Sequence, residues 1–243
     1  MLWYKSWLET RWRFIIGMAL VLCSAAGTVI TYPHIQQLIA LTPTMDFSGP
    51  LGKEIREGIE LARTFRGFVW SNWYHQNLPH LATLFAILLG TAGLLSESRG
   101  ALFTLSLPVS RNRLLGVRAA AGLGELFVLT FVPSFLIPLF APAIGESYSI
   151  TSVIVHGLCA FIAASVFFAF ALWLSTIWSD LWRPLLVALG VALVSPLAGF
   201  SKVISGETWF RSGQLPWGGL LASAAISAVL YSLAARNLTR RDF

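Results

Sequence analysis

Six long stretches of this sequence contain no Asp, Glu, Lys or Arg, and they constrain the fold more than any other feature. They cover residues 14–45, 67–96, 126–145, 147–179, 184–201 and 212–235. A helix of roughly 20 apolar residues crosses a hydrocarbon core about 30 Å thick. The stretches are continuously apolar and lack the period-2 alternation of strands. The sequence therefore predicts an all-α membrane protein with six transmembrane helices, near residues 14–31, 79–96, 122–142, 153–177, 184–200 and 217–235.

Composition excludes several other classes of protein. Charged residues make up 12% of the 243 residues, whereas a soluble domain carries about 25%. Hydrophobic residues make up 56%, which excludes a disordered chain. Cys23 and Cys159 both fall in apolar stretches, so a disulfide framework is excluded. The net charge of +6 is spread between the apolar stretches, which is typical of membrane topology and not of a nucleic-acid-binding face.

The placement of Lys and Arg predicts the orientation of the chain. Basic residues are more frequent in the segments that share a side with the two termini, and those on the other side are balanced by nearby acidic residues. Because cytoplasmic loops carry an excess of Lys and Arg, both termini are expected in the cytoplasm. The whole chain, 1–243, is expected to form one multi-pass domain in the inner (cytoplasmic) cell membrane.

Three segments outside the spans have patterns of their own. Residues 1–13 predict an interfacial helix with apolar and aromatic residues on one face, although an aromatic anchor is an equal alternative. The outer loop 33–77 contains apolar residues at helical spacing between 51 and 73, which predicts an amphipathic helix that gates an exit or only caps the bundle. The Pro- and Gly-rich flanks of 201–216 indicate a broken or re-entrant helix, or else a surface loop.

The cytoplasmic region 97–121 joins the second and third predicted spans and has the most distinctive pattern. It combines arginines with an apolar stripe that includes Leu102 and Leu105, and Pro108 stops a helix at or before Leu107. Ser110 is the expected N-cap of a second helix that leads into the third span. An apolar stripe exposed to water requires a partner surface, so a short docking helix is expected here.

Few residues in this chain could carry out catalysis. No Gly-x-x-x-x-Gly-Lys-Ser/Thr motif is present, and the four histidines are not at metal-ligand spacing. Ionisable residues near the membrane are functional candidates, and here they are Glu97 and Glu125, at the cytoplasmic ends of spans two and three. We expect one of them to form a salt bridge with an arginine of the 97–121 region. Pro133 and Pro138 are candidate hinges in the third span, or simply bend it to fit its neighbours.

The 97–111 segment resembles the permease subunits of ABC-2 type ABC transporters. The resemblance rests on Glu97, Gly100 and the run Leu105-Ser106-Leu107-Pro108-Val109-Ser110-Arg111, and it departs at Ala101, where threonine is frequent. The opening Trp3-Tyr4-Lys5 with Glu9, Arg11 and Arg13-Phe14 is also similar to the start of such permeases. The local motif covers about 15 residues, and the six-span layout extends the likeness to the whole chain.

The resemblance implies a function as a transport subunit. A separate ABC ATPase subunit would bind ATP and Mg²⁺, and this chain itself would hold no cofactor. The family's cytoplasmic coupling helix would correspond to 97–111 and would dock on the ATPase. The contact residues would include Glu97, Gly100, Leu102, Leu105, Leu107, Pro108 and Arg111. A second copy of the permease, or a homologous permease, would complete the path, with Glu125 and the two prolines as candidate path or hinge residues.

Two other functions remain open from the sequence. The first is an intramembrane enzyme, whose best available residues are Ser134, Ser165, Ser175, Thr176 and His156. The second is a membrane anchor or sensor that transports nothing, in which the docking helix serves signalling.

Overall fold

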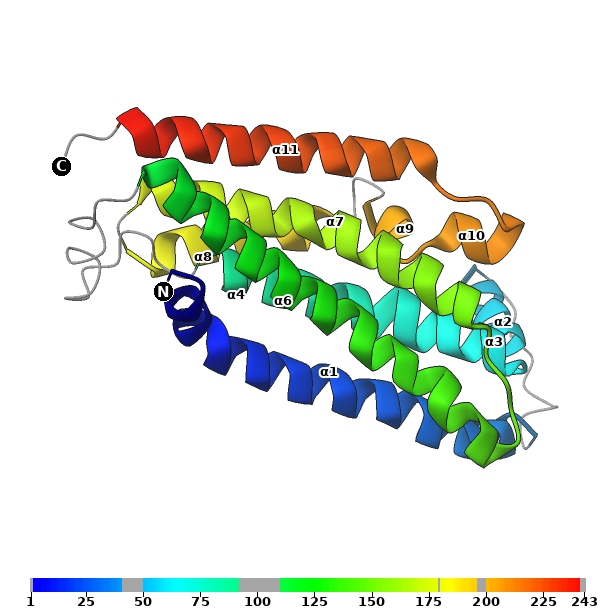
Figure 1. The fold of residues 1–243 in the computed structure, drawn as a ribbon. Coiled ribbons are helices and arrows are strands. Elements are labelled where there is room, and N and C mark those ends of the chain that lie inside the picture. The colour runs from blue at the N-terminus through cyan, green and yellow to red at the C-terminus, as the bar shows by residue number, and fades with distance from the viewer. Residues whose placement is uncertain (1, 41–49, 92–109, 179, 196–199, 241–243) are drawn as a thin grey trace.

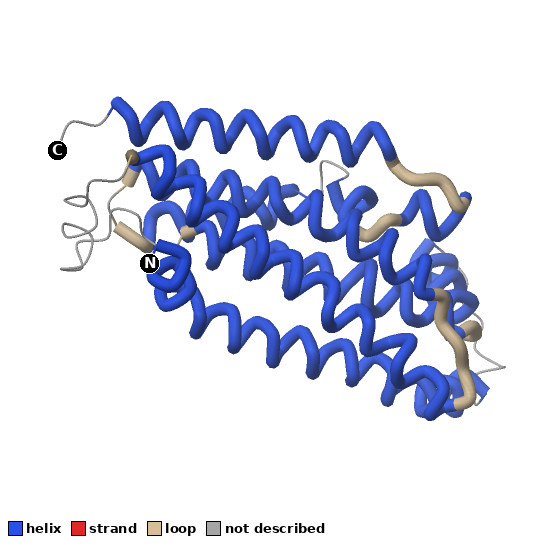
Figure 2. Tube along the Cα trace, in the orientation of Figure 1, coloured by secondary structure: helices blue, strands red, loops and turns tan. Residues whose placement is uncertain are grey.

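The structure is a computed structural model, and it describes residues 2–40, 50–91, 110–178, 180–195 and 200–240. Every regular element in these ranges is helical. Figures 1 and 2 show the long helices side by side in one elongated bundle. The elements are α1 (Leu2–Ala40), α2 (Pro50–Ala62), α3 (Phe65–Val69), η1 (Trp70–Asn77), α4 (Leu78–Gly90), α6 (Arg111–Phe140), η2 (Ala141–Ile144), α7 (Ile150–Ile177), α8 (Trp182–Val194), α9 (Phe200–Ile204), α10 (Glu207–Ser212) and α11 (Trp217–Arg240).

Four of the described helices are long and apolar enough to cross a membrane. They are α1, α6 together with η2, α7 and α11. These helices indicate a membrane-embedded protein, as the sequence predicts. The predicted spans near 79–96 and 184–200 correspond to α4 and α8, which have 13 residues each. A lone helix of that length is too short for a bilayer core, which needs about 20 residues.

Helix α4 is, however, the last part of a longer helical rod. The cap residues Val69, Trp70 and Leu78 all have right-handed helical dihedrals, so α3, η1 and α4 run on from Phe65 to Gly90 without a break. The middle part, η1, is a π-helix, in which the N–H of Leu78 bonds to the carbonyl of Trp73. The wider π turn places Trp73 and Tyr74 in the interior, where both are almost completely buried.

The two helices predicted outside the spans, at 1–13 and 51–73, begin and end at different residues in the structure. Helix α1 is continuous from Leu2 to Ala40, so it contains both the predicted interfacial segment and the first span, and it continues past the predicted start of the loop at residue 33. Figure 1 shows its first turns (dark blue) at an angle to the remainder. The predicted amphipathic helix between 51 and 73 is divided, because α2 ends at Ala62 and Thr64 caps α3 by accepting a bond from the Gly67 N–H.

One end of the bundle gathers segments that are far apart in the sequence. The start of α1, the end of α4, the start of α6 and the end of α11 lie together there, on the left of Figure 1. We call this the proximal end. A hydrogen bond from Arg111 Nη1 to the Leu238 carbonyl (3.2 Å) joins the start of α6 to the end of α11. Helices α2, α3 and α10 lie at the opposite, distal end.

Close approach of helices holds the centre of the bundle together. Helix α7 packs against α4, α6, α8, α9 and α11, whereas α1 packs on α6 and α4. Glycines permit these approaches, because a Cβ on Gly122 would lie 2.5 Å from the Phe168 ring and one on Gly17 would lie 2.8 Å from the Phe85 ring. Small residues at helix contacts are the usual way in which membrane helices pack closely, because association inside lipid depends on direct packing.

Candidate functional site

A cluster of polar side chains lies between three helices at the proximal end. Glu9, Thr10 and Arg13 come from α1, and Arg118 and Glu125 come from α6. We call these five residues, with the Leu88 carbonyl of α4, the polar junction. The spacing within each helix puts these residues on one face, because 9, 10 and 13 lie about one turn apart in α1 and 118 and 125 lie two turns apart in α6. The packing of α1 on α6 brings the two faces together.

Three contacts define the polar junction. The Thr10 hydroxyl donates to Glu125 Oε1 over 2.5 Å, and Arg13 Nη1 donates to the Leu88 carbonyl over 2.6 Å. Arg118 Nη1 lies 3.7 Å from Glu9 Oε2 in an ion pair. Thr10, Arg118 and Glu125 are all buried, with 3%, 8% and 7% of their surface exposed. Burying a charged group costs free energy unless the group is paired. Helices α1 and α6 must therefore keep their relative positions for these groups to remain paired.

Some buried polar atoms of the polar junction have no hydrogen-bond partner among the described residues. Within the described ranges, Arg118 Nε and Nη2 and Glu125 Oε2 are buried and have no hydrogen-bond partner. Such atoms are uncommon, because more than about 90% of buried polar groups in proteins are paired. The junction is therefore able to accept a different set of contacts if its helices shift.

The polar junction connects α1 to both helices that flank residues 92–109. Arg13 holds the last turn of α4, which precedes that segment. Glu9 and Thr10 hold α6, which follows it. Of the two glutamates predicted to pair with an arginine of the 97–121 region, Glu97 lies outside the described residues. The carboxylate of Glu125 bonds to Thr10, and Arg118 of this region pairs with Glu9. Glu125 is buried in the bundle.

Most residues of the predicted docking helix lie outside the described ranges. Glu97, Gly100, Leu102, Leu105, Leu107 and Pro108 are all among them. Of the predicted contact residues, Arg111 is described, and its guanidinium bonds to the Leu238 carbonyl. Ser110 occupies the predicted N-cap position of α6 in extended backbone conformation, and its carbonyl accepts bonds from the N–H groups of Arg113 and Leu114.

The predicted hinge prolines both lie within α6. The helix continues through Pro133 and Pro138 to Phe140, and Pro142 falls in the 3-10 turn η2. Ser134, which follows Pro133, is fully buried and accepts a bond from Trp73 Nε1 over 3.3 Å. The two prolines are therefore in the distal part of α6, and the residue that follows the first of them bonds to the π-helical segment.

Aromatic residues and two histidines form a cluster at the distal end. Trp70 of η1 and Phe210 of α10 stack with ring centroids 4.3 Å apart, and the Arg66 guanidinium lies over Phe210. The Tyr74 and His156 rings are also 4.3 Å apart. Burial raises the pKa of the neighbouring Tyr148 phenol, between α6 and α7, above its ordinary value. The sequence showed the aromatic residues but not their contacts. The position of Phe210 depends on the bend between α9 and α10 at Gly206 (φ +63°).

The residues considered for an intramembrane enzyme do not form one site. His156 and Ser175 lie on α7 about 28 Å apart along the helix axis. Ser165 faces Ser227 of α11, and Thr176 bonds to the Trp173 carbonyl of its own helix. No group of three or more metal-ligating side chains occurs in the described residues. His156 is buried, and its Nδ1 is 2.7 Å from the Ser152 carbonyl.

Comparisons with protein-family models, curated proteins and solved structures find no match for this chain.

Replacing Thr10 with valine tests the contact between α1 and α6. Valine keeps the shape of threonine but leaves a buried carboxylate oxygen of Glu125 without its donor. We expect the free energy of unfolding to fall by about 1.5–3 kcal/mol, the range for hydrogen bonds to charged groups. Thermal unfolding of the purified protein in detergent measures the change.

Thr28→Val is the matched control for this substitution. Thr28 is buried in the same helix, but within the described part of the chain its hydroxyl bonds only to the Ser24 carbonyl one turn earlier. Its replacement should change stability by less than about 0.5 kcal/mol. Equal effects at the two positions would show that the Thr10–Glu125 bond adds nothing to stability.

Proposed function

We propose that this chain is the membrane-spanning permease subunit of an ABC-2 type exporter in the inner (cytoplasmic) cell membrane, and that a separate ATPase subunit hydrolyses ATP. The observation that carries the proposal is the polar junction, which connects α1 to the helices on both sides of the predicted docking segment. A displacement of that segment would therefore move α1, α4 and α6 together. The likeness of residues 97–111 to the family's coupling helix supports the same assignment.

In this proposal, six helical segments cross the membrane. The second span is the continuous rod α3–η1–α4, and the fifth is the predicted 184–200 segment, which begins with α8. The proximal end faces the cytoplasm, because among the described residues it carries more basic than acidic side chains. The basic residues there are Lys5, Arg11, Arg13, Arg111, Arg113, Arg118, Arg183, Arg236 and Arg240, and the acidic ones are Glu9, Glu125 and Asp180.

The proposed transport cycle uses the junction as a mechanical connection. Closure of the ATPase subunits pushes the docking helix, and α4 and α6 move with it. Arg13 and the Thr10–Glu125 bond transmit this movement to α1. The unpaired nitrogens of Arg118 provide contacts for a second arrangement of the helices. Packed helices change between discrete arrangements and do not deform continuously, so this connection favours two states.

Two permease chains, or this chain and a homologous one, line the transport path in the proposed complex. Pro133 and Pro138 allow α6 to bend in its distal part without disturbing the junction, because each removes one backbone hydrogen bond. Outward transport is assigned by analogy with the family.

Charge substitution in the docking segment tests this proposal. Leu105→Asp places a charge on the predicted apolar stripe, and Thr104→Asp places the same charge off the stripe. We expect Leu105→Asp to reduce the amount of ATPase retained on the tagged chain at least about tenfold, as for a central apolar contact at an interface. Thr104→Asp should retain the ATPase, and Glu97→Arg should reduce ATP hydrolysis by the complex.

The proposal fails if Leu105→Asp and Glu97→Arg retain both the ATPase subunit and its rate of ATP hydrolysis. Membrane insertion of each variant is verified by its yield in the membrane fraction. This control separates loss of docking from loss of the folded chain.

A further inference from the structure

A groove opens on the side of the bundle near the distal end. It has a volume of about 400 Å³ and lies between η1, α4, α7, α8 and α9. Small-ligand pockets usually have volumes of about 300–1,000 Å³. The groove opens at the protein surface, because Leu84 and Leu193 on its walls are 37% and 82% exposed. It is separate from the polar junction, none of whose residues line it.

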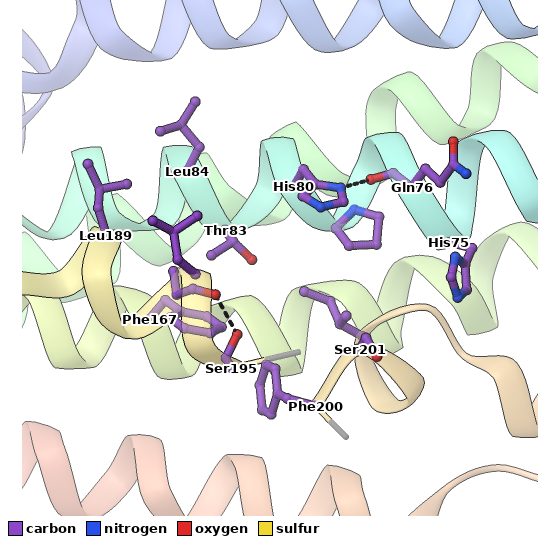
Figure 3. A pocket seen from close by; sticks show the side chains of 14 residues that line it. His75, Gln76, His80, Thr83, Leu84, Phe167, Leu189, Ser195, Phe200 and Ser201 are labelled. Carbon is purple, nitrogen blue, oxygen red and sulfur yellow. Dashed lines mark hydrogen bonds between the residues drawn. The ribbon is translucent and has the colours of Figure 1, made fainter. Parts of the chain in front are cut away.

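The two ends of the groove differ in chemistry. His75, Gln76 and His80 lie at one end, and Leu84 and Leu189 lie at the other (Figure 3). His80 Nδ1 is hydrogen-bonded to the Gln76 carbonyl, which fixes the ring and leaves Nε2 for another partner. The polar end therefore offers two imidazoles and an amide to a small polar group. The remainder is a mainly hydrocarbon surface.

The direction of the groove matches the way an amphiphile lies in a bilayer. Its polar end belongs to η1 and the first turn of α4, near the distal end of the bundle. Its apolar end continues along α4 and α8 toward the middle of the bundle. A molecule with its head at the membrane surface and its chain pointing inward has the same polarity. A volume of about 400 Å³ accommodates one acyl chain, and the second chain of a phospholipid would lie outside the groove.

We propose that this groove binds a single-chain amphiphile with a carboxylate head, such as a long-chain fatty acid. The carboxylate accepts hydrogen bonds from His75 and the Gln76 amide. It pairs with His80 as an imidazolium, because the Nδ1–H of His80 already donates to the Gln76 carbonyl and only the doubly protonated ring has an Nε2–H to donate. The chain lies against Leu84, Leu189 and Leu193. Binding requires only one copy of this chain. It does not depend on the proposed ATPase partner or on transport.

Photolabelling of the purified full chain in detergent tests the proposal. The probe is palmitic acid with a photoactivatable diazirine on its chain, and adducts are located by peptide mass spectrometry. We expect adducts in α4 and α8 that unlabelled palmitic acid displaces, whereas hexadecane, which has no polar head, does not. A phosphatidylcholine with the same diazirine on one chain should not label these helices in a displaceable way.

Substitutions at the two ends provide matched comparisons. Ala192→Trp fills the apolar part of the groove, and Ala225→Trp on the exposed face of α11 is its control. His80→Leu removes a polar partner, and His34→Leu, at an exposed position of α1, is its control. We expect Ala192→Trp and His80→Leu each to weaken labelling about tenfold and both controls to leave it unchanged.

Three results would overturn the proposal. The first is that hexadecane displaces the palmitic acid probe as well as unlabelled palmitic acid does. The second is that only the phosphatidylcholine probe gives labelling that a competitor displaces. The third is that all four variants are labelled to the same extent. Size-exclusion chromatography establishes that each variant is folded. If Ala192→Trp does not fold, the competition between palmitic acid and hexadecane on the unsubstituted chain decides the question without it.

Discussion

Replacing Arg118 with alanine is expected to lower the free energy of unfolding by about 3–5 kcal/mol, because removal of one partner leaves buried charges without compensation. Arg118 is 8% exposed and pairs with Glu9, and Glu125 is buried two turns further along the same face of α6. Without the guanidinium, Glu125 retains only the Thr10 hydroxyl as a partner among the described residues. Thermal or denaturant unfolding in detergent measures this loss.

Arg113→Ala is the control for this substitution. Arg113 lies on the same helix, five residues earlier, but its side chain is exposed. Its replacement should change stability by no more than about 0.5 kcal/mol. If Arg118→Ala were as stable as Arg113→Ala, the polar junction would not hold α1 against α6, and the proposed mechanical connection would lose its structural basis.

The second large effect is expected at Gly90, the last residue of α4. A Cβ at this position would lie 2.6 Å from the Phe168 carbonyl oxygen and 2.9 Å from the Ala171 Cβ of α7. The first of these neighbours is backbone, which cannot rotate away as a side chain can. Gly90→Val should therefore separate α4 from α7 and cost about 3 kcal/mol, the upper part of the range for overpacked sites.

Gly124→Val provides the comparison for Gly90→Val. Gly124 lies on an exposed face of α6, and a Cβ there would have no neighbour within 4 Å. The substitution is the same, so any difference in the midpoint of thermal unfolding reports the contact between α4 and α7. Similar midpoints for the two variants would mean that these helices are further apart than in the structure.

The sequence predicted the long helices well, for a physical reason. Apolar stretches inside a membrane must form helices, because helices satisfy their own backbone hydrogen bonds. Helices α6, α7 and α11 therefore lie close to their predicted ranges, and Ser110 marks the start of α6. The length of α1 and the π-helical turns of η1 were not predicted. Both depend on packing, in particular on the burial of Trp73 and Tyr74.

The polar junction was only partly predictable. Glu125 was singled out because an acidic residue in an apolar stretch is a functional candidate. Its partner Thr10 lies 115 residues away in the sequence, so only the packing of α1 on α6 shows the contact. The close approaches at Gly17, Gly90 and Gly122 were not predicted for the same reason. A glycine in an apolar helix gives no indication of the neighbour that it faces.

The composition of the complex purified from its native membrane is the most direct test of the proposed function. The mass of the intact complex, measured together with its rate of ATP hydrolysis, determines which subunits accompany this chain. We expect two membrane-spanning chains and two P-loop ATPase chains that hydrolyse ATP. Isolation of this chain without any nucleotide-hydrolysing subunit, under conditions that preserve other membrane complexes, would contradict the proposal.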